Sequence, residues 1–225
     1  MKSVILTIII LAAAVISSSV IRRFFLDRLS RQLYEAAYVK KDKELFEILI
    51  ASPQARMLMS DVSRDIMSLN FRISMDDREM AVRTAERLLK KKLNLQEAQS
   101  VYLSVIAYLC EKEDTKALDF LTDMKNRFQD SKDLNTMLML YDCELTYDVY
   151  IRKDTGRIRD LEELISTDID PESKAVYQYR LAKLYHYEGD KEKAVQLLNE
   201  AKDNTKNDGA RKKIDRILSG DWDRL

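Results

Sequence analysis

Residues 181–201 read LAKLYHYEGDKEKAVQLLNEA, two apolar helical stretches separated by Gly189 and Asp190. Each stretch carries apolar residues at the three- and four-residue spacing that places side chains on one face of a helix. These residues are Leu181, Leu184 and Tyr185 in the first stretch and Ala194, Leu197, Leu198 and Ala201 in the second. Helices this short are marginal in isolation. We therefore predict that the two helices pack against each other and against neighbouring helices.

Local signals bracket both helices. Asp170, Pro171 and Glu172 form a helix start, with Asp as the N-cap, Pro in the first turn and Glu near the positive end of the helix dipole. Gly189 suits the left-handed conformation of a C-terminal cap, and Asp190 can then cap the next helix. Small Ala194 allows the two helices to cross closely.

This pair resembles a tetratricopeptide repeat. The residues that stand at the spacing of that family are Leu181, Ala182, Tyr185, Gly189, Ala194, Leu198 and Ala201. The chain departs from the family pattern at the early Trp position, where it has Gln178, and at the closing Pro position, where it has Lys206. The resemblance implies a right-handed stack of helix pairs with a concave groove that takes peptides or partner helices.

Upstream segments repeat the pattern more loosely. Ala81, Ala117, Gly156 and Ala194 recur at intervals of 36, 39 and 38 residues, slightly above the 34-residue tetratricopeptide period. An N-terminal pair, Leu29–Lys40 and Lys43–Ala51, places Phe46 where the other units have a small residue. We expect an all-α fold, a right-handed α-solenoid of about five helix pairs over residues 28–205, closed by a capping helix that Asp208 and Gly209 open. A non-repetitive helical bundle is the alternative.

The composition agrees with a helical protein. The 225 residues include only 4 Gly and 2 Pro, the main punctuators of strands and loops. The 38 basic residues balance the 38 acidic ones, which argues against a nucleic-acid-binding protein. Cys110 and Cys143 lie in apolar stretches and read as buried free thiols.

The N-terminus contains an uncharged apolar segment, Ser3–Ile21, of 19 residues. A helix of this length nearly spans the ~30 Å hydrocarbon core of a bilayer. We therefore predict one transmembrane helix within an anchor at residues 1–23, followed by a helical repeat domain at residues 24–225. A cleaved signal peptide, with its cleavage site near Ser17–Ser19, is the alternative interpretation.

The charges that follow the segment predict its orientation. Arg22, Arg23, Arg28 and Arg31 follow it, whereas only Lys2 precedes it. The positive-inside rule then places the larger domain of a single-pass cell-membrane protein in the cytoplasm. Two unpaired cysteines are consistent with that reducing compartment.

Sequence motifs for catalysis are lacking. His186 is the only histidine, and the four glycines are isolated. The sequence therefore contains neither a histidine-based metal motif nor a Gly-rich phosphate loop. We expect no enzyme activity, no metal and no cofactor.

A binding function remains. By the resemblance, the first helix of each pair lines the groove, and the residues facing it would be Tyr102, Ile106, Leu109, Tyr179, Lys183 and His186. Aromatic and cationic side chains suit an extended peptide or an acidic terminus. The expected function is a membrane-anchored scaffold or adaptor that binds a protein or peptide partner. A secreted or extracytoplasmic helical binding protein is the alternative.

Overall fold

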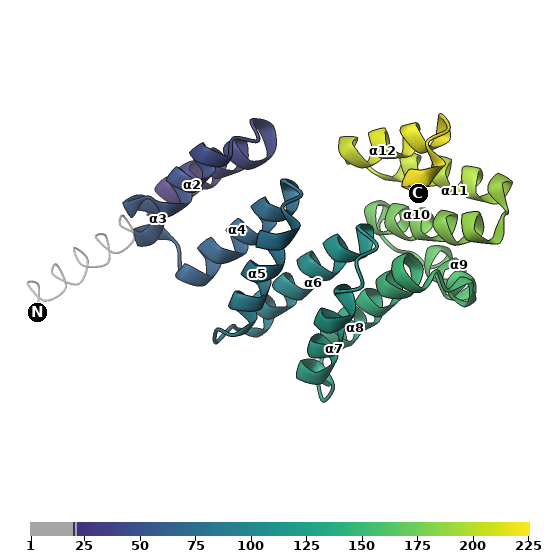
Figure 1. Ribbon diagram of the computed structural model, residues 1–225, viewed down its shortest axis with the longest axis horizontal. Coiled ribbons are helices and arrows are strands. Elements are labelled where there is room, and N and C mark those ends of the chain that lie inside the picture. Colours follow the sequence, from purple (N-terminus) through teal and green to yellow (C-terminus); the bar gives the residue numbers. More distant parts are fainter. Residues whose placement is uncertain (1–19, 21) are drawn as a thin grey trace, which may run out of the picture. The chain divides into compact units, whose positions relative to one another are not determined.

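The computed structural model describes residue 20 and residues 22–225 (Figure 1). Within this part every regular element is helical, which confirms the all-α class. The predicted membrane span, Ser3–Ile21, lies outside the described residues apart from Val20. Among the helices that are described, none combines the length and the apolar character needed to cross a membrane.

The chain divides into two compact units, Met1–Val105 and Ile106–Leu225. The boundary falls inside one helix, α6 (Leu95–Glu111). Each unit is described by itself.

The N-terminal unit begins with helical residues 22–34, which run into a π-helical turn, η1 (Glu35–Val39). Four helices follow before α6: α2 (Lys43–Ala51), α3 (Pro53–Leu58), α4 (Asp61–Ser74) and α5 (Arg78–Leu89). The core contains Leu29, Leu33, Phe46 and Phe71, and the two phenylalanine rings stack with their centroids 4.0 Å apart.

Side-chain caps set the boundaries of these helices. The N-cap side chains of α2, α3, α4 and α5 each accept a hydrogen bond from a backbone N–H in the first turn, and these caps are Asp42, Ser52, Ser60 and Asp77. The predicted helix Lys43–Ala51 is confirmed at both ends. Pro53 occupies the first turn of α3, a helix for which no apolar pattern was recognised in the sequence.

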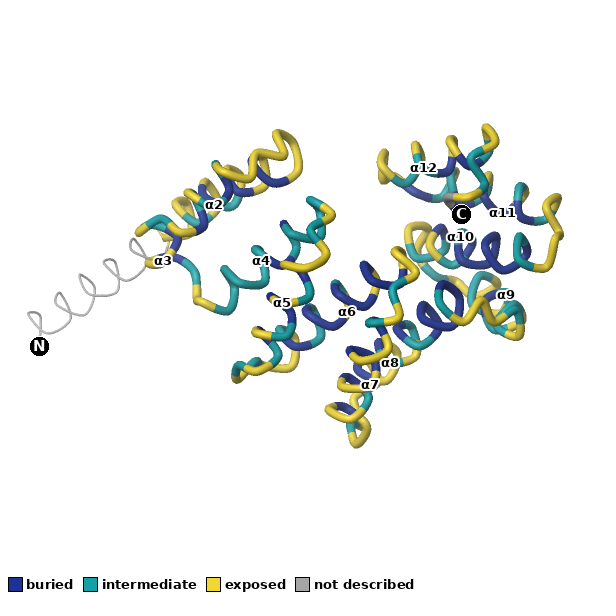
Figure 2. Tube along the Cα trace, viewed as in Figure 1, coloured by how far each residue is buried: buried dark blue, intermediate teal, exposed yellow. Residues whose placement is uncertain are grey.

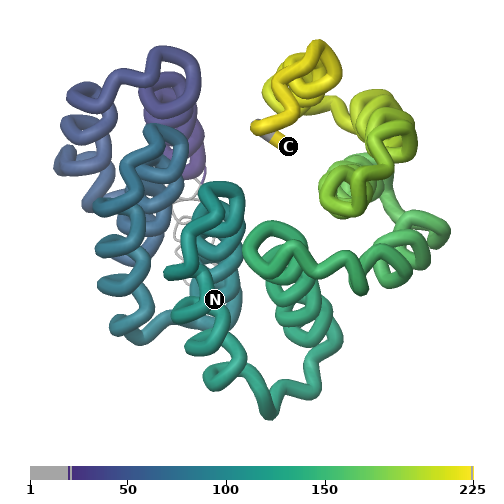
Figure 3. The backbone as a smooth tube through the Cα atoms, turned by 45° about the vertical axis from the view of Figure 1, so that its right-hand side comes forward, coloured from purple at the N-terminus to yellow at the C-terminus, as the bar shows by residue number. Residues whose placement is uncertain are grey.

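The C-terminal unit continues from the last turns of α6 through α7 (Ala117–Phe128) and α8 (Leu134–Tyr147). A π-helical turn, η2 (Asp148–Arg152), and a 3₁₀ turn, η3 (Thr155–Arg157), lead into α9 (Ile158–Ser166). The remaining elements are α10 (Pro171–Glu188), α11 (Lys191–Asn204), α12 (Asp208–Leu218) and the 3₁₀ turn η4 (Trp222–Arg224). Consecutive helices pack on each other: α7 on α8, α9 on α10, α10 on α11 and α11 on α12 (Figure 3).

Helix α10 is the centre of this unit. Asp170 caps it by accepting from the Ser173 N–H, and Gly189 ends it with φ +84° in the left-handed region. Asp190 then caps α11, and Ala194 is completely buried. The structure therefore confirms the predicted starts of both helices, the end of the first at Gly189 and the close packing of the two helices. The middle of α10 is buried on nearly all sides (Figure 2).

One predicted packing position is wrong. Gly156 was expected to be the small residue of a helix crossing, but it is exposed in η3 and donates its N–H to the Asp154 side chain. The turn there is organised by a buried carboxylate instead. Asp148 is 1 % exposed and pairs with Arg152 at 2.9 Å and with Arg157 at 2.7 Å. These ion pairs fix the corner between α8 and α9, so the chain needs no close helix contact at Gly156.

Candidate functional site

The candidate site is a double cavity beside α10 in the C-terminal unit. Its walls come from the end of α6, from η2, from α10 and from α12. The first part, here called the apolar chamber, has a volume of about 320 Å³; the second, the charged chamber, about 580 Å³. Glu111, Tyr150 and Lys213 line both chambers.

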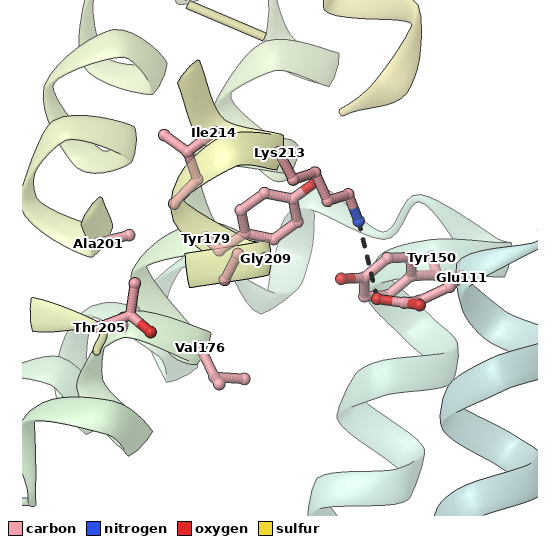
Figure 4. A pocket seen from close by; sticks show the side chains of 11 residues that line it. Glu111, Tyr150, Val176, Tyr179, Ala201, Thr205, Gly209, Lys213 and Ile214 are labelled. Atoms are coloured by element: carbon pink, nitrogen blue, oxygen red, sulfur yellow. Dashed lines mark ion pairs between the residues drawn. The ribbon is translucent and has the colours of Figure 1, made fainter. Parts of the chain in front are cut away.

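The apolar chamber is built by helix spacing. Ala175 and Val176 lie four and three residues before Tyr179 on α10, and together they line the chamber with Gly209, Ala210 and Ile214 of α12. Figure 4 shows Tyr179 beside Gly209 and Ile214. Small residues on α12 leave the space that larger side chains would fill. An ion pair between Lys213 and Glu111, with nitrogen and oxygen 3.7 Å apart, lies at the side shared with the charged chamber (Figure 4).

Tyr179 contributes an unusual polar group to this chamber. Its hydroxyl is buried and makes no hydrogen bond with the protein, while Lys213 lies over its ring at 5.0 Å. Burial also raises the pKa of this hydroxyl, so it stays protonated at neutral pH and can donate. Buried polar groups are rarely left without a partner. Because the hydroxyl oxygen itself has almost no accessible surface, a ligand group in the chamber could accept a hydrogen bond from it only after a small movement of the side chains around it.

The charged chamber is organised around Lys183. This side chain is almost fully buried, and its ammonium group lies 5.0 Å from the ring centroid of Tyr150 and 5.4 Å from that of Tyr187. It donates a hydrogen bond to the backbone oxygen of Leu225 and lies 3.6 Å from Glu113. Burial lowers the pKa of Lys183 to about 8, because desolvation disfavours the charged form. A cation enclosed by two aromatic rings and one carboxylate is suited to hold a carbonyl or carboxylate oxygen.

Polar contacts fix α10 relative to its neighbours. Arg180 donates to Asp142 of α8, with nitrogen and oxygen 2.5 Å apart. On another side, the Tyr185 hydroxyl donates to Glu162 of α9 at 2.6 Å, and Lys193 of α11 reaches both. These contacts tie α10 to α8, α9 and α11, so the cavity wall that α10 supplies is a fixed surface rather than a loop.

The predicted groove residues separate into two groups. Tyr179 and Lys183 on α10 line the cavity, and His186 lies on the same helix, where its ring stacks on Trp222 at 5.3 Å. Tyr102, Ile106 and Leu109 on α6 are completely buried. In this structure those three side chains belong to the interior and offer no surface to a partner, because tight packing covers the face that the repeat resemblance assigned to a groove.

Other cavity residues were not found from the sequence. Tyr150 lies in a π-helical turn whose geometry no helical pattern predicts, and Glu111 and Lys213 are charged residues typical of a solvated helix face. Trp222 lies beyond the end of α12, and no local pattern shows that it stacks on His186 of α10.

The two cysteine thiols of this unit are poor nucleophiles. Burial raises the pKa of both the Cys110 and Cys143 thiols to about 12, so neither supplies a thiolate nucleophile at neutral pH. Both are free and buried, as predicted. Across residue 20 and residues 22–225, no group of three or more His, Cys, Asp or Glu side chains is placed to hold a metal ion.

Comparison with known proteins adds no relative. No family model, no curated protein and no solved structure matches the chain.

Proposed function

We propose that this chain is a protein-interaction module that binds a peptide segment of a partner in the double cavity beside α10. The observation that carries the proposal is the buried, unpartnered hydroxyl of Tyr179 in the wall of the apolar chamber. It is a hydrogen-bond donor in a cavity that is otherwise largely apolar.

A peptide supplies what the two chambers can accept. Its backbone carries a carbonyl at every residue, and such a group can accept from Tyr179 while an apolar side chain fills the space beside Val176. Lys183 in the charged chamber offers a second donor for a carbonyl or carboxylate. The chamber volumes are in the range of sites that take compact ligands or anchor side chains. The resemblance of residues 181–201 to a tetratricopeptide repeat supports the same class of partner.

The proposal includes attachment to a membrane. It rests on the uncharged segment Ser3–Ile21 and on the arginines that follow it. The full chain should remain in the membrane fraction after extraction at alkaline pH, and its N-terminal residues should be present in an intact-mass spectrum. A mature chain that begins near Val20 would instead support the secreted alternative.

Peptide display against the purified full chain tests the binding function. Display should enrich related peptides, and Val176→Glu should abolish their binding. Val176 is half exposed at the cavity wall, so a carboxylate there fills and charges the apolar chamber without disturbing the core. Leu138→Glu is the matched control, because Leu138 is similarly exposed on α8 and lines neither chamber. Failure to enrich any peptide, or equal loss in both variants, would refute the proposal.

A further inference from the structure

The last turn of the chain lies against α10 as a short peptide would. Trp222 stacks on His186 with an interplanar angle of 27°, and Lys191 lies over the same indole at 4.9 Å. Three residues later, Leu225 is buried and lines the charged chamber. Its backbone oxygen accepts the hydrogen bond from Lys183. Two of the three predicted groove residues on α10 are therefore already engaged by residues 222–225.

The segment is joined to α12 through Gly220, whose φ of +123° lies in the left-handed region. The N–H groups of Gly220 and Asp221 donate to carbonyls in the last turn of α12. Residues 222–225 are held by the ring stack on His186 of α10, the cation–π contact with Lys191 of α11, the hydrogen bond from Lys183 of α10 and the burial of Leu225. The ring stack, the cation–π contact and the hydrogen bond are each weak by themselves. The segment can therefore leave α10 without unfolding of α12.

We propose that residues 222–225 are an internal ligand of the α10 site, and that the partner peptide presents the same pattern: an aromatic residue followed three positions later by an aliphatic residue whose carbonyl meets Lys183. This inference rests on the proposed function and specifies its ligand. The tethered segment forms the wall of the charged chamber next to Lys183 until a partner displaces it. Residues 222–225 do not line the apolar chamber. A partner peptide that also binds there makes contacts that the segment lacks, and can therefore displace it.

Trp222 reports on this exchange directly, because it is the only tryptophan in the chain. In the full chain its fluorescence should be protected from acrylamide. Adding a display-selected peptide should shift the emission to longer wavelength and increase the quenching. His186→Ala should produce the same change without peptide, whereas Lys212→Ala on the exposed side of α12 should not. A tryptophan that is fully quenchable in the unmodified chain would overturn the inference.

A binding measurement separates the inference from the proposed function. In the double variant Trp222→Ala, Leu225→Ala, the selected peptide should bind about tenfold tighter or more. The reason is that the bound segment no longer lowers the fraction of molecules whose site is free to bind the peptide. Equal affinity for the unmodified chain and the double variant would overturn the internal ligand while leaving the binding function intact. Absence of any binding to either protein would contradict the proposed function itself.

Discussion

Arg180 on α10 donates to Asp142 on α8, and the two partners differ in exposure: the arginine side chain is 9 % exposed and the aspartate side chain 32 %. The cost of breaking this pair should therefore depend on which partner is removed. Asp142→Ala leaves a buried guanidinium without its carboxylate and should cost about 3 kcal/mol of unfolding free energy. Arg180→Met leaves a carboxylate that water reaches and should cost only about 1 kcal/mol.

Urea unfolding of the two single variants and of the double variant measures this asymmetry. The double variant should be no less stable than Asp142→Ala, because the stranded charge is gone. Equal losses in both single variants would show that the burial of Arg180 does not control the pair.

Ala194 provides a test of the helix pair that the sequence predicted. It is completely buried where α10 and α11 pack together. Ala194→Leu should cost about 1–3 kcal/mol through overpacking, whereas Gln196→Leu on the exposed side of α11 should change stability by no more than about 0.5 kcal/mol. Thermal or urea melts with similar losses for both would contradict this helix phase.

The sequence predicted α10 and α11 well because their signals are local. An Asp cap, a first-turn Pro, a left-handed Gly and an apolar stripe all act within one helix, and the structure confirms each of them. Lys193 precedes the buried Ala194; its side chain is 44 % exposed, and its ammonium reaches Glu162 and the Tyr185 hydroxyl. A sequence pattern places a lysine on an outer face but does not show which neighbour its long side chain reaches.

Gly189 should be sensitive to substitution for a reason confined to the backbone. Its φ is +84°, and a Cβ at this position would meet nothing within 4 Å. Gly189→Ala should therefore cost about 1 kcal/mol from the left-handed conformation alone. Gly189→Asn should cost less, because Asn tolerates that conformation better. If Asn were worse than Ala in melting experiments, crowding rather than backbone conformation would govern the site.

Lys183 should make stability depend on pH. Burial lowers its pKa to about 8, against about 10.4 in an unfolded chain. Between these values the unfolded state binds the proton and the folded state does not, so this lysine makes the free energy of unfolding rise with pH. Lys183→Met removes the titration. The unfolding free energy of the unmodified chain minus that of the variant should therefore increase from about pH 8 to about pH 10.4.

The difference between the two proteins is needed because other groups titrate in the same window. The Cys110 and Cys143 thiols have pKa values raised to about 12, so they lower stability as the pH rises above their unfolded value of about 8.5. This contribution is common to both proteins and cancels. A difference that stays flat or falls across the window would show that Lys183 is not desolvated.

The candidate site was predicted only in part, and the reason is sequence separation. Tyr179, Lys183 and His186 share one face of α10, which helical spacing reveals. The Lys183 contact with Leu225 joins residues 42 positions apart, and no local pattern encodes it. The three predicted residues on α6 are completely buried. Tyr102, Ile106 and Leu109 have the spacing of a helix face, but spacing does not show whether that face is open or covered.

The central claim, that the cavity beside α10 binds a peptide, is tested most directly by photo-crosslinking. A display-selected peptide carrying a photoreactive phenylalanine analogue would be bound to the full chain and irradiated, and the attachment sites located by mass spectrometry. The account predicts attachment to α10 between Ala175 and His186 and to α12 between Gly209 and Ile214. Attachment confined to α7, or to the N-terminal unit, would contradict it.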